Sequence, residues 1–433
     1  MCRVMSQVMN PLKPIYSFGI WVCRQGVRVA ANSGNIKARR LNDGLNGVFQ
    51  KLENAVRPLD RNIWIHAASL GEFEQGRPLM ERLRACRPEL KIILTFFSPS
   101  GYEVRKSYAG ADVVSYLPFD TPRNVRRFLE IVNPEKAIFV KYEFWMNYLD
   151  ALHKRNIETY LISGIFRPEQ LFFRTYGGFY RRVLRDFTTL YLQDHGSRRL
   201  LEGIGISNTK VAGDTRFDRV ADIRASVKPD ETLSLFCGPQ RNERRAEADP
   251  VIFMAGSSWP EDEKIYLDWL LREEGVKGVI APHEFDELRL KKLLDLCSGN
   301  AVLLSDARRD PTLLSGKKIL IIDCFGLLSS AYSYADIAYV GGGFGAGLHN
   351  INEAAVYGIP VMFGPNHHKF IEAGEMKTLG AGIPVDGKSR FEHHAIRLVR
   401  DSKERLRRGK WAAEYIASKT GASDIIFSDL FGT

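Results

Sequence analysis

The sequence contains no apolar run long enough to cross a membrane. The best candidate lies within 14–31, where an apolar stretch of about nine residues precedes Arg24 and Arg28, whereas a spanning helix needs ~20. No signal-peptide cleavage pattern is clear, because basic residues follow the stretch as much as they precede it. The segment predicts either an interfacial helix with its aromatic side chains in the lipid headgroup layer, or a helix packed on the protein body.

Cysteine is scarce and irregularly placed. The six cysteines form no CxxC pair and no dense framework, which is typical of free thiols in a reducing compartment and argues against a structural zinc site. The chain also lacks a P-loop GK[ST], a regular GxGxxG and any RNP, KH or helix-turn-helix signature. The motifs therefore favour neither a P-loop nucleotide site nor a nucleic-acid partner.

Composition and net charge limit the classes of protein and of binding partner that fit this chain. The chain has 433 residues, of which 45% are hydrophobic and 26% charged, as in an ordinary globular protein of two or three domains. Its net charge of +10 and pI near 9.2 favour an anionic partner, such as a nucleic acid, an anionic membrane surface or a phosphorylated substrate. Charge alone does not choose among these.

Strand-like runs alternate with helical patterns along the chain, which predicts parallel sheets covered by helices on both faces. One series runs from NIWIHAAS to TLYLQD and a second from VIFMAGS to PVMFGP. We therefore predict an α/β fold of two doubly wound, Rossmann-like domains that face each other across a cleft. The predicted segments are a membrane-associating segment at 1–35, a first domain at 36–225, a linker region at 226–250, and a second domain with the C-terminal helices at 251–433.

A glycine-rich loop is the strongest local signal in the second half. Gly341, Gly342 and Gly343 follow a strand, and a helix is expected to open near Asn350. Glycines permit close backbone approach, and amides at a helix start carry partial positive charge, so this junction suits a phosphate. Glu353, one turn into the expected helix, could accept both hydroxyls of a ribose. The alternative is that the loop is only a turn.

Two further strand ends in this half carry polar groups. Ser257 and Ser258 lie at one strand exit, and Pro282 and His283 follow another. The serines could equally cap the helix that begins at Pro260, and an isolated histidine is more often structural. Three strand ends that converge on one glycine loop nevertheless indicate a nucleotide pocket.

Strand ends in the first half carry a different chemistry, suited to a hydroxylated and anionic ligand. A carboxylate stands where the strand NIWIHAAS becomes a helix, and hydroxyl or charged groups follow two later strands. Each could instead cap a helix or pair internally, and two of them, Lys141 and Glu143, could neutralise one another. The residues in question are Glu72, Ser98, Ser100, Lys141 and Glu143.

Several motifs in the same order resemble one family, the 3-deoxy-D-manno-octulosonic acid (Kdo) transferases of lipopolysaccharide biosynthesis. They are HAASLGEF, TFFSPSGYE, GDTRFDRV, GSSWPEDE and GLHNINEAAVYGIPVMFGP. The resemblance implies a GT-B glycosyltransferase that moves Kdo from CMP-Kdo to a lipid A precursor on the cytoplasmic face of the inner membrane, as a peripheral or N-terminally anchored protein. It also implies inversion at the sugar and no metal or other cofactor.

The resemblance assigns the acceptor or Kdo side to the first domain. Glu72 matches the glutamate of the family's Ser-x-Gly-Glu-Phe motif, which implies a general base that takes the proton from the acceptor hydroxyl. Small residues before it, Ser69 and Gly71, would let the acceptor sugar approach the backbone. Lys141 and Arg216 would meet the Kdo carboxylate or an acceptor phosphate, and Ser98, Ser100 and Glu143 complete the expected set.

The donor side falls on the second domain. By similarity Asn350 lies near the phosphate, Glu353 takes the ribose, Ser257 and Ser258 neighbour the phosphate, and Pro282 and His283 border the cytosine, with Gly341 to Gly343 as the loop. Two stretches depart from the family pattern: Gly-Leu-His-Asn-Ile at 347–351 replaces Gly-Gly-His-Asn-Pro, and Ala-Pro-His at 281–283 replaces Pro-Arg-His.

Two alternatives compete with the Kdo transferase. Another GT-B enzyme that uses a UDP-sugar, or a sugar-nucleotide epimerase, would share the fold and the ribose glutamate, but it would not predict the Ser-x-Gly-Glu-Phe motif. A non-catalytic protein that binds anionic lipid or nucleic acid explains the +10 charge but gives no reason for Glu72 at a strand end.

Overall fold

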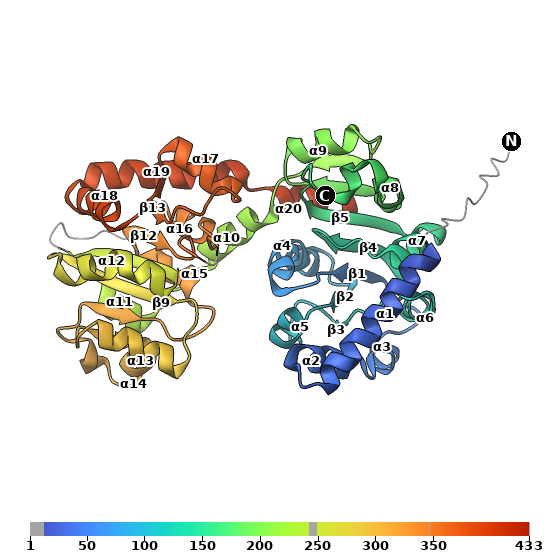
Figure 1. Cartoon of the computed structure of the whole chain (residues 1–433), viewed down its shortest axis with the longest axis horizontal. Helices are drawn as coiled ribbons and strands as arrows, with labels where there is room; N and C mark the ends of the chain where they lie inside the picture. The colour runs from blue at the N-terminus through green and yellow to red at the C-terminus, as the bar shows by residue number, and fades with distance from the viewer. Residues whose placement is uncertain (1–12, 242–248, 346, 433) are drawn as a thin grey trace. The chain divides into compact units, whose positions relative to one another are not determined.

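The computed structural model describes residues 13–241, 249–345 and 347–432 and divides into two compact units (Figure 1). Unit 1 comprises Met1–Arg219 and Gly421–Thr433, and unit 2 comprises Val220–Thr420. The first twelve residues of the predicted segment 1–35, and 242–248 of the predicted linker region, lie outside the described residues.

Unit 1 contains a seven-stranded parallel sheet with the strand order β3-β2-β1-β4-β5-β6-β7. Neighbouring strands of the sheet pair in parallel. Ile65 of β1, for example, lies opposite Leu94 of β2 on one side and Ile138 of β4 on the other. The strands are β1 (Asn62–His66), β2 (Lys91–Phe96), β3 (Val113–Tyr116), β4 (Pro134–Val140), β5 (Glu158–Gly164), β6 (Thr189–Leu192) and β7 (Thr209–Val211).

Helices cover both faces of this sheet. They are α1 (Lys13–Asn32), α2 (Ile36–Leu45), α3 (Val48–Ala55), α4 (Leu70–Cys86), α5 (Pro99–Arg105), α6 (Pro122–Val132), α7 (Met146–Lys154), α8 (Gly178–Arg185), α9 (His195–Glu202), α10 (Thr215–Ser226), which runs into unit 2, and α20 (Ala422–Phe431), with short 3-10 turns at Leu171–Phe173 and Thr175–Gly177.

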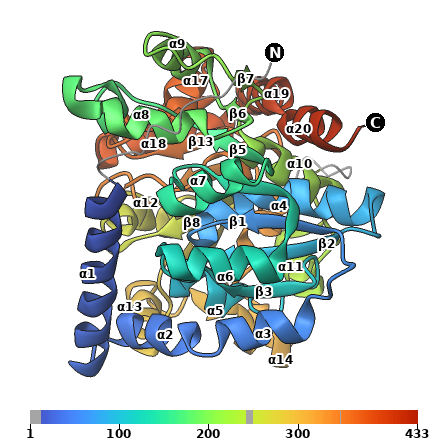
Figure 2. The same ribbon diagram turned by 90° about the vertical axis from the view of Figure 1, so that its right-hand side faces the viewer.

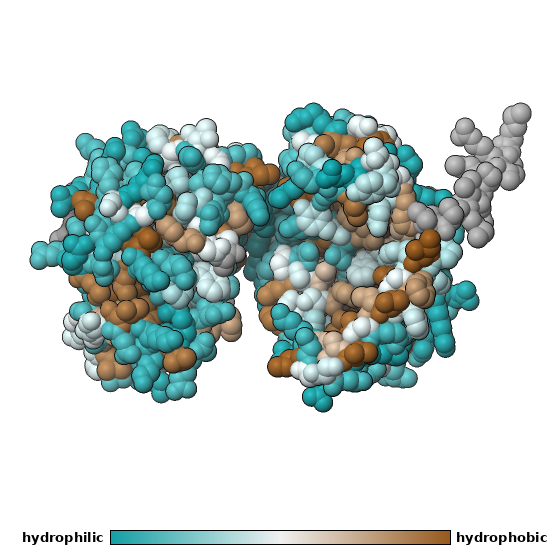
Figure 3. All heavy atoms as spheres, in the orientation of Figure 1, coloured by the Kyte–Doolittle hydropathy of each residue, from teal (hydrophilic) through white to brown (hydrophobic). Residues whose placement is uncertain are grey.

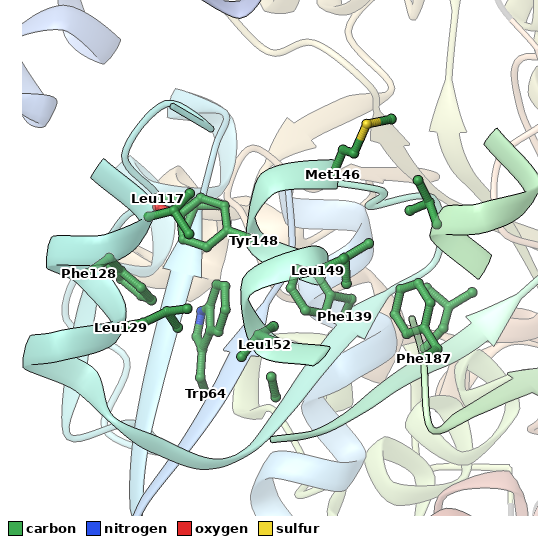
Figure 4. Packing of buried hydrophobic residues seen from close by; sticks show 14 of the residues in the cluster. Trp64, Leu117, Phe128, Leu129, Phe139, Met146, Tyr148, Leu149, Leu152 and Phe187 are labelled. Atoms are coloured by element: carbon green, nitrogen blue, oxygen red, sulfur yellow. The ribbon is translucent and has the colours of Figure 1, made fainter. Parts of the chain in front are cut away.

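The core on one face of this sheet is built around Trp64 of β1 (Figure 4). Its ring lies 4.8 Å from that of Phe128 on α6, 5.0 Å from Phe139 on β4 and 5.3 Å from Tyr148 on α7, measured between centroids. Every residue of β1 is buried because helices pack on both faces, as expected for an all-parallel sheet.

Unit 2 repeats this architecture with the strand order β10-β11-β9-β8-β12-β13-β14. Its strands are β8 (Val251–Ser258), β9 (Val276–Pro282), β10 (Ala301–Leu303), β11 (Ile319–Ile321), β12 (Ile337–Val340), β13 (Val361–Phe363) and β14 (Gly382–Pro384). Its helices are α11 (Glu231–Cys237), α12 (Pro260–Arg272), α13 (Glu287–Leu296), α14 (Leu304–Arg309), α15 (Leu328–Ala331), α16 (Asn352–Ala355), α17 (Ile371–Leu379), α18 (Lys388–Arg400) and α19 (Ser402–Lys419), with 3-10 turns at Pro311–Leu314 and Tyr332–Tyr334.

The last helix, α20, belongs to unit 1, whereas the sequence analysis assigned all of 251–433 to the second domain. Its apolar residues Ile426, Phe427 and Leu430 join the hydrophobic core beside α4. Asp218 accepts hydrogen bonds from the backbone N–H groups of Gly421 and Ser423, at 2.5 and 2.6 Å. These contacts are long-range, so the local helical pattern could not reveal which domain the helix completes.

The first described helix, α1, packs on unit 1, which was one of the two alternatives raised by its sequence. Tyr16 donates a hydrogen bond of 2.7 Å to the buried Asp120 and so holds the helix on unit 1. Ile15, Phe18 and Trp21 are 66%, 64% and 50% exposed. Figure 2 shows the course of α1, and in Figure 3 brown, hydrophobic atoms form an exposed band along this helix. Within the described chain, no helix combines the length and apolar character needed to span a bilayer.

Candidate functional site

Glu72 occupies the third position of α4, directly after β1. One carboxylate oxygen, Oε2, accepts hydrogen bonds from the backbone N–H and the hydroxyl of Ser69, at 2.7 and 2.5 Å, which is a capping box. The side chain is half-buried and Gly71 beside it is exposed. Glu72 therefore caps its helix through one oxygen, and this role is compatible with chemistry at the other.

Lys141 lies directly after β4 and interacts electrostatically with several charged residues of unit 1. It has a φ of 68°, a left-handed conformation that is unfavourable for a residue with a Cβ and that clusters at functional sites. Burial lowers the pKa of its ammonium group, and the charge of Arg216 lowers it further, while Asp214 and Glu72 oppose the shift. Unit 1 thus brings the predicted residues Glu72, Lys141 and Arg216 into one electrostatic neighbourhood.

Arg216 is held by the residue two positions before it. Its guanidinium donates to Asp214, with Nε at 2.8 Å and Nη2 at 2.7 Å from Oδ2. Asp214 is buried and also accepts the backbone N–H of Arg216 at 2.9 Å. Arg216 is thus fixed near the start of α10 by a buried carboxylate.

Glu143 is oriented by two aromatic neighbours that the sequence analysis missed. The fully buried His66 lies with Nε2 3.1 Å from Glu143 Oε2, and the indole N–H of Trp145 donates to the same oxygen at 2.6 Å. Glu143 therefore does not pair with Lys141, which was the alternative. His66 lies inside the HAASLGEF motif, so its position offered a signal, whereas Trp145 offered none.

Ser98 and Ser100 serve the start of α5. Ser98 is the N-cap and accepts the backbone N–H of Ser100 at 3.3 Å, and the two hydroxyl oxygens lie 2.9 Å apart. Within unit 1, these contacts are those of a helix cap, which was the alternative to a ligand-binding role for the two serines.

The predicted serines at the end of β8 differ from one another. Ser257 has a φ of 50° and is half-buried. Ser258 is 1% exposed and its hydroxyl lies 2.7 Å from that of Tyr266. Ser258 thus faces the protein interior, whereas Ser257, in a left-handed conformation, is partly exposed near the carboxyl end of β8.

Close packing explains the glycines of the loop after β12. A Cβ at Gly341 would lie 2.3 Å from the carbonyl oxygen of Ser257, and one at Gly343 would lie 2.7 Å from the backbone of Gly364. Gly342 has a φ of 88° and donates its N–H to Asp262 at 2.9 Å. The amide of Gly342 therefore has a protein acceptor.

Asp262 organises the start of α12 around that loop. It accepts the backbone N–H of Trp259 at 3.0 Å and the hydroxyl of Tyr339 at 2.8 Å, besides Gly342. Burial raises the pKa of this carboxyl, although the three donors oppose the rise. The ends of β8 and β12 are thereby fixed to each other.

The helix expected near Asn350 is only the single turn α16, Asn352–Ala355. Asn350 accepts the N–H of Asn352 and donates its side-chain amide to Glu353 Oε1, both at 3.2 Å. Ser329, which the sequence analysis missed, donates its hydroxyl to Glu353 Oε2 at 2.5 Å. Glu353 is thus a positioned, half-buried carboxylate, the type of acceptor that binds vicinal hydroxyls.

His283 lies in a cluster of three rings. Its ring centroid is 4.7 Å from that of Trp259 and 4.5 Å from that of His349. Trp259 donates its indole N–H to His349 Nε2 at 3.1 Å. Neither Trp259 nor His349 was among the predicted residues, because their relation depends on three separate strand ends meeting.

Comparison with known proteins agrees with the motifs. Residues 39–219 match the sequence model of a family described as 3-deoxy-D-manno-octulosonic-acid transferase (kdotransferase). A 3-deoxy-D-manno-octulosonic acid transferase of Chlamydia muridarum is 27% identical, over 80% of this chain and 81% of that protein. A protein of the same name from Haemophilus influenzae is 25% identical, over 94% of this chain and 95% of its own length.

The fold resembles that of solved two-domain enzymes. The UDP-GlcNAc 2-epimerase of Neisseria meningitidis, bound to UDP-GlcNAc, superimposes with a TM-score of 0.61 at 15% identity, over 86% of this chain and all of that one. Together with the two parallel seven-stranded sheets, this likeness defines the fold class: the chain has the two-domain α/β architecture of the GT-B fold. The family model over residues 39–219 and these relatives at 25–27% identity support a glycosyltransferase similar to the Kdo transferases, which confirms the resemblance of its motifs.

Proposed function

We propose that the protein transfers Kdo from CMP-Kdo to a phosphorylated lipid A precursor, with inversion at the anomeric carbon. One observation carries this proposal. Lys141, whose backbone is strained, interacts electrostatically with both Glu72 and Arg216 in unit 1. A carboxylate beside two cations suits a hydroxyl nucleophile on an anionic substrate. The net charge of +10 agrees with that substrate class.

Glu72 is the proposed general base. Its carboxylate takes the proton of the acceptor hydroxyl, whose oxygen then bonds to the anomeric carbon of Kdo, while the bond from that carbon to the phosphate oxygen breaks and CMP leaves with the electron pair. Lys141 and Arg216 would hold the Kdo carboxylate or an acceptor phosphate in place. The proposed reaction uses no metal and no other cofactor.

Unit 2 supplies the proposed donor site. The carboxylate of Glu353, oriented by Ser329 and Asn350, would accept the ribose hydroxyls of CMP. Asn350 and the loop of glycines would lie near the phosphate, and His283, which is exposed beside Pro282, would border the cytosine. These groups all lie at or after the carboxyl ends of strands of the same sheet, and this common location supports the proposed donor site.

The product assay tests the proposed function. We expect purified protein with CMP-Kdo and a lipid A precursor to release CMP and to form a lipid whose mass has increased by Kdo, at the same rate with and without a metal chelator. Release of CMP and lipid mass are measured together, so hydrolysis of the donor is distinguished from transfer. A chain that forms no Kdo-bearing lipid contradicts the proposal, and loss of activity in the chelator contradicts the metal-free reaction.

We further propose that the protein works as a peripheral protein on the cytoplasmic face of the inner membrane, attached through α1. The exposed band on α1 contains Phe18 and Trp21, whose rings stack at 5.8 Å, and α1 is tied to unit 1 through Tyr16. An amphipathic helix of this type inserts its apolar side chains between headgroups while its cations meet lipid phosphate.

Replacement of Phe18 and Trp21 together by serine is expected to weaken binding to vesicles containing anionic lipid by at least about tenfold, because two aromatic side chains lose their burial in the bilayer interface. Cosedimentation measures the bound fraction. The matched control replaces Phe325 by serine, an exposed aromatic in unit 2 that is 88% accessible. Equal binding of the two variants would show that α1 is not the attachment site.

A further inference from the structure

The cluster of Trp259, His283 and His349 has a specific geometry. The Trp259 and His349 ring planes differ by only 12°, and their centroids are 6.5 Å apart. A hydrogen bond of 3.1 Å joins their edges, so these two rings lie side by side and nearly coplanar. His283 stacks on Trp259 with ring centroids 4.7 Å apart, and its ring centroid lies 4.5 Å from that of His349 with the planes tilted by 31°. The three residues come from the ends of β8 and β9 and from the segment after β12.

The hydrogen bond determines which nitrogen of His349 carries the proton. An indole N–H is only a donor, so the Nε2 atom that receives it must present a lone pair, and the proton of the neutral ring must be on Nδ1. Burial lowers the pKa of His349 to about 4, with a smaller contribution from His283. Near neutral pH the ring is therefore an uncharged donor through Nδ1.

His349 is also fixed against the glycine loop. Its backbone N–H donates to the carbonyl oxygen of Gly341 at 3.2 Å, and a Cβ at Gly342 would lie 3.0 Å from its Cδ2 atom. Asp262 binds the backbone N–H groups of both Trp259 and Gly342. The backbones that carry the tryptophan and the loop are therefore held by one buried carboxylate, so the indole and the imidazole keep their mutual position.

We propose that Trp259 is a positioning residue that holds His349 in the neutral Nδ1–H form, so that His349 donates a hydrogen bond to the phosphate of the nucleotide leaving group. The phosphate contact rests on the proposed function, because it requires a nucleotide in unit 2. The fixed tautomer does not, since it follows from the ring geometry of the free protein.

Histidine NMR on the free protein tests the tautomer without any substrate. In ¹⁵N-histidine-labelled protein, the signal of His349, assigned by its loss in His349→Gln, is expected to show a protonated Nδ1. In Trp259→Phe, the pKa of His349 is expected to rise by roughly one pH unit, because the donor that favours the unprotonated ring is gone. Trp269→Phe is the matched control: it removes an indole from the core of the same unit whose Nε1 makes no hydrogen bond within the described structure. An unchanged tautomer and pKa in Trp259→Phe would overturn the positioning role.

Calorimetry with CMP tests the phosphate contact. Trp259→Phe is expected to weaken CMP binding about three- to tenfold, which corresponds to one neutral hydrogen bond, and the double variant with His349→Gln should bind no more weakly than His349→Gln alone. Additive losses would overturn coupling through His349. Wild-type protein that binds no CMP would contradict the phosphate contact and the proposed donor, while the NMR result still decides the positioning role.

Discussion

Replacement of Glu72 by glutamine is expected to lower kcat for Kdo transfer by ~10²- to 10⁴-fold, the contribution of a general base. The glutamine retains a carbonyl oxygen that can accept the two hydrogen bonds from Ser69, so the capping box survives. The free energy of unfolding should therefore change little. Product formation under saturating substrate and thermal unfolding are measured on the same preparation.

The alanine variant separates capping from catalysis. Glu72→Ala loses the cap as well as the carboxylate, so it should lose ~1 kcal/mol of stability and show the same fall in kcat as the glutamine variant. If Glu72→Gln turned over at nearly the wild-type rate, Glu72 would be only a helix cap. The base would then have to be sought elsewhere, with Glu143 as the next candidate because its orientation is fixed by His66 and Trp145.

Replacement of Glu353 by glutamine is expected to raise the Kd for CMP by roughly 10- to 100-fold. A carboxylate accepts both ribose hydroxyls, and hydrogen bonds to a charged group contribute about 1.5–3 kcal/mol. The glutamine amide keeps the size of the side chain but replaces one acceptor oxygen with a donor. Calorimetric titration of the free protein with CMP measures the change directly.

Two further variants sharpen that result. Ser329→Ala removes the hydroxyl that orients Glu353 and should weaken CMP binding less than Glu353→Gln, because the carboxylate remains. Glu375→Gln changes a carboxylate of the same unit that contacts Tyr415 and Lys419, and it should leave the Kd unchanged. A Glu353→Gln protein with wild-type affinity would remove Glu353 from the ribose site.

The architecture was largely readable from local pattern. Runs such as NIWIHAAS and VIFMAGS became β1 and β8, because buried parallel strands are almost continuously apolar. The placement of α20 was not readable, because an amphipathic helix shows that it packs but not on what. A helix was expected to open near Asn350, and the structure has the single turn α16 there.

The site was predictable where chemistry coincides with a strand end. Glu72, Lys141 and Glu353 were chosen as candidates in this way, because the carboxyl ends of parallel strands meet at one edge of a sheet, and their roles stay predictions. Trp259 and Ser329 were missed because each acts through a partner far away in sequence. Nothing in a tryptophan at a helix start indicates that its indole N–H will meet a histidine ninety positions later.

The assignment of α20 to unit 1 has a consequence for biosynthesis. The chain leaves the ribosome from its N-terminus, and domains generally fold as their residues emerge. Unit 2 is continuous along the chain, but the core of unit 1 lacks Ile426, Phe427 and Leu430 until the chain that follows unit 2 is made. Unit 1, whose synthesis begins before that of unit 2, is therefore completed only after unit 2, and until then the surface of α4 that receives α20 is uncovered.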